Sequence, residues 1–129
     1  MIGLAMTALV VPDYDEAIAF FREGLGFSLV EDSDLGEGKR WVVMEGSHGG
    51  RLLLARAVND DQRAAIGNQT GGRVGWFLDT DDFATDHARL TAWGVEFTDG
   101  PRDEAYGKVA VFNDPWGNRW DLIERKEAA

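Results

Sequence analysis

Short apolar runs with the length of β-strands dominate the chain. They are rich in the apolar and β-branched residues that suit a pleated surface, and they cover residues 4–11, 27–34, 40–45, 51–55, 74–79, 95–98, 108–113 and 119–123. Two longer segments are predicted as helices instead. In the first, four apolar residues recur at helical spacing and form one face, namely Ala17, Phe20, Phe21 and Leu25. The second, after Asp82, predicts another helix. Each half therefore reads strand, helix, strand, strand, strand.

Polar residues mark where these helices begin and where the halves divide. Asp13 or Asp15 can cap the first long helix, and the Asp81-Asp82 pair can cap the second. A short helix begins at Asn59, because Gln62 follows at the spacing of a capping box. The halves align with an offset of about seventy residues, as an internal repeat does. We predict a first module over 1–56, a short helix with a Gly-rich linker over 57–72, and a second module over 73–129.

This element order predicts an α+β fold in which each helix covers one face of its sheet. The other two faces are then bare and can curl around a shared cavity, where we expect the function to lie. Composition agrees with one compact domain of 129 residues, since 44% are hydrophobic and 28% charged. No apolar run reaches the length of roughly 20 residues that a membrane helix needs, and no signal-peptide pattern occurs, so we expect a cytoplasmic protein.

The charge of the chain limits the classes of partner that it can bind. It has 23 acidic and 13 basic residues, a net charge of −10, and no cysteine. This charge argues against nucleic acid and anionic membranes as partners, and it favours a cationic small molecule, although solubility alone also explains it. The lack of cysteine excludes disulfides, thiolate catalysis and cysteine-based zinc sites.

The stretch from Val109 to Ile123 predicts a β-hairpin with a five-residue loop, Asp114-Pro115-Trp116-Gly117-Asn118. Together with Val11-Pro12-Asp13 through Leu25-Gly26-Phe27, and with Asp81-Asp82-Phe83 through Gly94-Val95, it resembles the vicinal oxygen chelate superfamily. That group comprises glyoxalases, extradiol dioxygenases, and fosfomycin- and bleomycin-resistance proteins. The resemblance implies two paired βαβββ modules that form a curved eight-stranded mixed sheet around a cavity, usually in a homodimer.

The metal enzymes of that family place ligands at four inward-facing strand positions. The matching residues here are Met6, Leu53, Gly75 and Asp121. Only Asp121 can bind a hard cation, whereas a catalytic zinc, iron or manganese needs about three nitrogen or oxygen ligands. The chain thus departs from the metal enzymes at three of the four positions, and we expect no metal site and no cofactor. We expect His48 to be a solvated loop residue and His87 a surface or boundary residue of the second long helix.

Alternation along the strands predicts which other residues share the inner face. Trp76 and Trp120 should point to the helix side and pack in the core. Gly75 should open space for a bulky ligand. Arg119 and Asp121 can pair with each other; otherwise Asp121 or Asp79 can receive a cationic group of a ligand. Arg102, in the loop before the seventh strand, can rim the cavity. The predicted ligand-binding residues are Trp41, Leu53, Gly75, Phe77, Asp79, Tyr106, Trp116, Arg119 and Asp121.

Three functions fit these residues. The first is binding of a small aromatic or cationic ligand without a catalytic metal, as the resemblance to bleomycin-resistance proteins implies. The alternative is a lyase, an oxygenase-type enzyme or another enzyme of this fold that uses Asp121 or Asp79 as acid or base. A third is a degenerate copy that only binds a protein partner.

Overall fold

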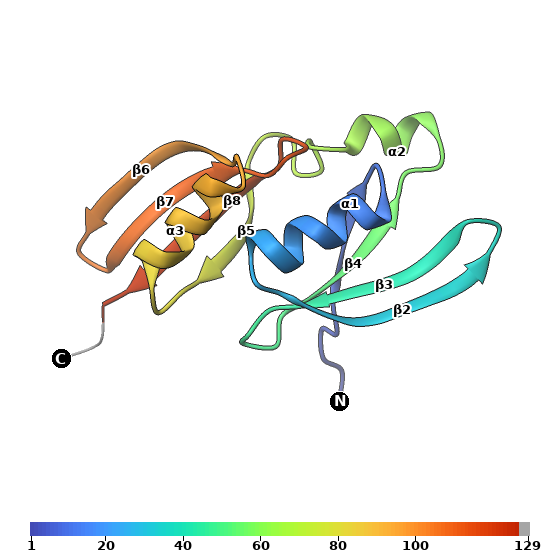
Figure 1. Cartoon of the computed structure of the whole chain (residues 1–129), viewed down its shortest axis with the longest axis horizontal. Helices are drawn as coiled ribbons and strands as arrows, with labels where there is room; N and C mark the ends of the chain where they lie inside the picture. Colours follow the sequence, from blue (N-terminus) through green and yellow to red (C-terminus); the bar gives the residue numbers. More distant parts are fainter. Residues whose placement is uncertain (127–129) are drawn as a thin grey trace. The chain divides into compact units, whose positions relative to one another are not determined.

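The computed structural model describes residues 1–126 and forms two compact units, Met1–Ile66 and Gly67–Ala129. The fold is α+β, with eight strands in two four-stranded mixed sheets and three α-helices (Figure 1). Each unit has the order βαβββ, as the sequence predicts. The boundary between the units falls within the predicted linker, and helix α2 (Asp60–Ala65) belongs to the first unit.

The first unit contains β1 (Thr7–Val11), α1 (Tyr14–Ala19), β2 (Ser28–Gly36), β3 (Lys39–Glu45) and β4 (Arg51–Arg56). The strand order is β1-β4-β3-β2, with β1 parallel to β4 and the other pairs antiparallel. Helix α1 packs on β3 and β4. The core lies between this helix and the sheet, and its members include Leu9, Val11, Ala17, Phe20, Phe21, Val42, Met44, Leu52 and Leu54.

The second unit repeats this plan with β5 (Val74–Asp79), α3 (Phe83–Ala92), β6 (Glu96–Glu104), β7 (Gly107–Asn113) and β8 (Arg119–Arg125). Its strand order, β5-β8-β7-β6, places β8 and β7 at the centre of the sheet. Helix α3 packs on β8 (Figure 1). The core between them includes Phe83, Leu90, Ala110, Phe112, Trp120 and Leu122.

The predicted helix caps form. Asp13 Oδ2 accepts a hydrogen bond from the backbone N–H of Glu16 at 2.8 Å, and Asp82 Oδ1 accepts one from Thr85 at 3.2 Å. Asn59 Oδ1 accepts from the backbone N–H of Gln62 at 2.9 Å. Hydrogen bonds from both the side chain and the backbone of Thr85 lower the pKa of Asp82. Equivalent aspartates therefore start the long helix of each unit.

Three element boundaries differ from the predictions. The first strand begins at Thr7, not at residue 4. The first long helix ends in a π-helical turn, η1 (Phe20–Gly24), in which the Leu25 N–H donates to the Phe20 carbonyl. Strand β6 continues well past residue 98, because register irregularities around Gly100-Pro101 let its second half pair with β7. Arg102, which we expected in a loop, lies opposite Val109 in this sheet.

Candidate functional site

Each unit offers one candidate surface, the helix-free face of its sheet, meaning the side away from its own helix. Strand alternation and register define these faces. In the first unit, Ala8, Leu53 and Val43 form one row across β1, β4 and β3. Trp41 lies on the same face two residues from Val43 and is half-buried. This surface is mainly apolar.

The second unit has a more polar helix-free face. Phe77, Asp121, Val111 and Asp99 form one row across β5, β8, β7 and β6. The neighbouring row contains Asp79, Ile123, Val109 and Arg102. Phe77 is 65% exposed although it is a large aromatic residue. An exposed ring directly beside a carboxylate can stack a flat group and attract a positive charge.

Asp121 occupies the centre of this face. Its side chain is half-buried, and its Oδ1 atom is buried with no hydrogen-bond partner. Burial raises the pKa of Asp121 above its usual value, while the positive charges of Arg102 and Arg125 act against the rise and the negative charge of Asp99 adds to it. A carboxylate in this setting gains from any donor or cation brought to it.

The structure does not form the Arg119–Asp121 pair that we considered. Within residues 1–126 no ion pair joins the two, and Arg119 is exposed at the start of β8, opposite Asn113. Residues two apart on a strand share a face but need not touch, and here the long Arg119 side chain extends into solvent. Asp79 does have a partner, because Arg125 Nε lies 3.3 Å from its Oδ1. Asp121 is thus the freer of the two candidate acids.

The aromatic candidates fall into two groups. Trp76 and Trp120 stack on each other with ring centroids 5.0 Å apart, and Trp120 is 1% exposed, so both pack on the helix side as predicted. Trp116, in the β7–β8 loop, is half-buried, and Tyr106, in the turn between β6 and β7, is 52% exposed. His48 is in an exposed loop, and His87 stacks on Phe97 with ring centroids 4.0 Å apart.

The four positions that match the family's metal ligands do not fit a metal. Met6 offers a thioether, Leu53 and Gly75 offer no donor, and only Asp121 carries an oxygen. Among the residues described, no group of three or more His, Asp or Glu side chains gathers where it could hold an ion. The space that we expected beside Gly75 is occupied, since a Cβ atom there would lie 2.5 Å from Thr70 Cγ2.

The β7–β8 loop is organised by hydrogen bonds to one carboxylate. Asp114 is 4% exposed and accepts five hydrogen bonds. Its Oδ1 binds the backbone N–H groups of Trp116, Gly117 and Asn118 at 2.9–3.0 Å. Its Oδ2 binds Asn118 Nδ2 at 2.8 Å and Trp120 Nε1 at 3.0 Å. The sequence reveals the turn but not this network.

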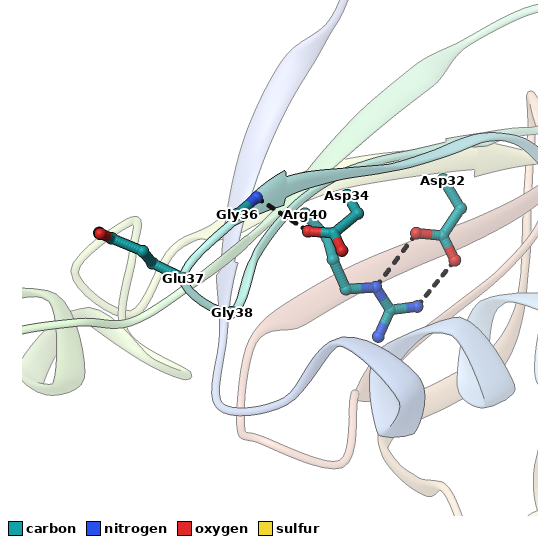
Figure 2. Close-up of a pocket in the computed structure, with 6 residues that line it drawn as sticks. All are labelled: Asp32, Asp34, Gly36, Glu37, Gly38 and Arg40. Carbon is teal, nitrogen blue, oxygen red and sulfur yellow. Dashed lines mark hydrogen bonds and ion pairs between the residues drawn. The ribbon is translucent and has the colours of Figure 1, made fainter.

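A surface depression of about 440 Å³ lies elsewhere, at the tip of the β2–β3 hairpin (Figure 2). Arg40 and Asp32 lie at its wall, with Arg40 Nη2 2.7 Å from Asp32 Oδ2. The hydrogen bond from Arg40 lowers the pKa of Asp32, and the carboxylates of Asp32 and Asp15 raise that of Arg40. None of the predicted ligand residues lines this depression. Its one cation, Arg40, is already paired with Asp32, and Asp34 accepts a hydrogen bond from the Gly36 backbone N–H.

Comparison with known proteins identifies the family. The family model for the glyoxalase/bleomycin resistance protein/dioxygenase superfamily matches residues 3–122. The chain belongs to this superfamily. An uncharacterized protein of Shewanella frigidimarina (strain NCIMB 400) is 52% identical over 120 residues, covering 91% of this chain and 89% of its own.

Solved structures agree with this assignment. The crystal structure of UcmS2 is 26% identical with a TM-score of 0.80, and covers 96% of this chain and 98% of its own. TnmS3, an antibiotic binding protein from Streptomyces sp. CB03234, is 30% identical with a TM-score of 0.69, and covers 98% and 99%. The superfamily has both enzymes and binding proteins, so membership alone does not choose between them. No helix within residues 1–126 is long and apolar enough to span a membrane.

Proposed function

We propose that this member of the superfamily binds a small organic ligand, with a flat aromatic part and a cationic group, on the helix-free face of its second unit and without a catalytic metal. The observation that carries the proposal is the adjacent pair Phe77 and Asp121. An exposed ring and a carboxylate with an unsatisfied oxygen lie on neighbouring strands, roughly 4.8 Å apart between backbones. A planar cation would satisfy both.

Three further facts support this function. Only one of the four metal-ligand positions has a donor, which argues against metal chemistry. The net charge of −10 attracts cations and repels nucleic acid. A relative 30% identical over nearly the whole chain is an antibiotic binding protein. The proposal includes a cytoplasmic homodimer. In the second unit, Asp79, Tyr106, Trp116 and Arg119 lie around the ligand, and in the first unit Trp41 and Leu53 form a separate apolar surface.

Fluorescence titration tests this function directly. Bleomycin and the planar cationic dye proflavine should bind, and the signal should be unchanged by EDTA. Asp121→Asn should weaken proflavine binding about ten-fold, since a charge-assisted hydrogen bond is lost, and Phe77→Ala should weaken it several-fold. Asp103→Asn makes the same charge change next to Lys108, on the helix side, and should have no effect. If neither bleomycin nor proflavine binds, the proposal is refuted. If binding is lost in EDTA, its metal independence is refuted.

One observation favours the enzyme alternative. The raised pKa of Asp121 is what a general acid or base needs to work near neutral pH. If the protein is an enzyme, Asp121→Asn should abolish turnover of a substrate while its binding is retained. If Asp121→Asn instead loses binding, and the wild type shows no turnover, sequestration of the ligand is favoured over catalysis.

A further inference from the structure

Asn113 is a second polar residue on the helix-free face that lacks a partner. It ends β7, opposite Arg119, and its side chain is half-buried. Its Oδ1 atom is buried and accepts no hydrogen bond. More than nine-tenths of buried polar groups in proteins have a partner, so such an atom calls for an explanation.

Asn113 and Asp121 are diagonal neighbours on the two central strands. Asn113 pairs with Arg119 and Asp121 with Val111, so the two side chains share a face. Diagonal positions on antiparallel strands lie roughly 7–8 Å apart, within the span of one ligand group and its contacts. Buried acceptors without partners are Asn113 Oδ1, Asp121 Oδ1 and Asn118 Oδ1 in the described chain, and only the last belongs to the β7–β8 loop.

The nearby cations do not supply the missing donors. Arg102 is engaged with Asp99, at 3.2 Å, and with Glu104. Arg125 is engaged with Asp79 at 3.3 Å. Arg119, opposite Asn113, is exposed. Two acceptors on the helix-free face therefore have no protein donor, while the guanidinium groups around them are bound to other carboxylates or extend into solvent.

We propose that Asn113 is a specificity-determining residue that acts with Asp121 to select ligands presenting a nitrogen group with at least two N–H donors, such as an aromatic amine or amidine. This inference rests on the proposed function and defines its ligand class. A ligand with a single donor, or with a fully alkylated nitrogen, leaves one buried acceptor unsatisfied and loses the corresponding affinity.

Two dyes of the same ring system test the inference. Proflavine carries two primary amino groups on a cationic acridine, and acridine orange carries dimethylamino groups at the same positions. The wild type should bind proflavine about ten-fold more tightly, the equivalent of one charge-assisted hydrogen bond. Asn113→Leu keeps the side-chain size but removes the acceptor, so it should weaken proflavine binding and bring the two affinities together. A purely steric preference would persist in this variant.

The controls separate the possible failures. Asn113→Asp keeps an acceptor and should preserve the preference for proflavine, which also guards against a leucine variant that does not fold. Asn68→Leu, at an exposed loop position, should bind as the wild type does. Equal binding of both dyes by the wild type would overturn this inference alone. Absence of binding by either dye or by bleomycin would overturn the proposed function, and the inference with it.

Discussion

Replacing Asp114 by asparagine should destabilise the second unit strongly, although the two side chains have almost the same shape. Asparagine has one oxygen where aspartate has two. If that oxygen keeps the three backbone N–H groups bound to Oδ1, the new NH₂ group faces Asn118 Nδ2 and Trp120 Nε1, which are themselves donors. The opposite amide orientation leaves three backbone donors unpaired instead.

The magnitude follows from the number of donors left without a partner. Each buried unpaired donor costs about 1–3 kcal/mol, so two of them cost about 2–6 kcal/mol. A domain of this size is stable by only about 5–15 kcal/mol. With a urea dependence of about 1–3 kcal/mol per molar, the midpoint of unfolding should fall by at least about 0.7 M.

Urea unfolding followed by tryptophan fluorescence measures this change, because Trp120 is both a partner of Asp114 and a buried reporter. Asp13→Asn is the matched control. Its carboxylate caps α1 through a single backbone N–H, and asparagine caps helices equally well. A loss of less than about 0.5 kcal/mol in Asp114→Asn, equal to the control, would show that the five hydrogen bonds do not hold the loop.

In urea unfolding, Gly67→Ala should lower the free energy of unfolding by about 2 kcal/mol more than Gly71→Ala does. Both glycines have positive φ (72° and 69°), but of the two only Gly67 would bring an added Cβ against a backbone atom, the Trp116 carbonyl oxygen, at 1.8 Å. Equal losses would mean that the loop moves aside. Burial raises the pKa of Asp121, so the contribution of this group to stability falls as pH rises above about 4. Asp121→Asn should therefore raise the melting temperature at pH 7 but not at pH 3. An identical shift of the melting temperature at both pH values would contradict this. Arg40→Lys should lower the free energy of unfolding by about 0.5–1 kcal/mol at pH 7, because Arg40 donates two hydrogen bonds to Asp32. The loss should shrink toward pH 2, where Asp32, whose pKa is lowered by Arg40, becomes protonated. A loss that does not depend on pH would assign the effect to packing.

The sequence was sufficient to predict features that follow from local periodicity. The period of two along β5 and β8 correctly placed Trp76 and Trp120 on the helix side. The capping residues Asp13 and Asn59 form the bonds expected of them, because a cap depends on residues only three positions apart. The same periodicity predicted the order of strands and helix along the chain in each unit, and the family resemblance is confirmed.

Features set by contacts distant in sequence could not be predicted in this way. The predicted strand ends at residue 98, before Gly100-Pro101, yet β6 continues to Glu104 because its second half finds partners on β7. The partner that takes Arg125 is Asp79, which lies 46 residues away, and no local signal reveals the pair. Asp114 looked like an ordinary turn residue, and only the fold brings Trp120 Nε1 back to its carboxylate. The proposed roles of the site residues remain predictions.

The two units share what the fold needs and differ where a ligand would bind. Each has an aspartate cap before its long helix and an apolar surface facing it. On the helix-free faces, however, the row containing Leu53 is apolar at its centre, whereas the corresponding row in the second unit centres on Asp121. A half-buried carboxylate with a buried, unsatisfied oxygen lowers stability, and the repeated plan shows that this fold can place a leucine at that point. The second unit therefore carries a polar group that folding does not require, which is the physical reason to look for recognition chemistry there.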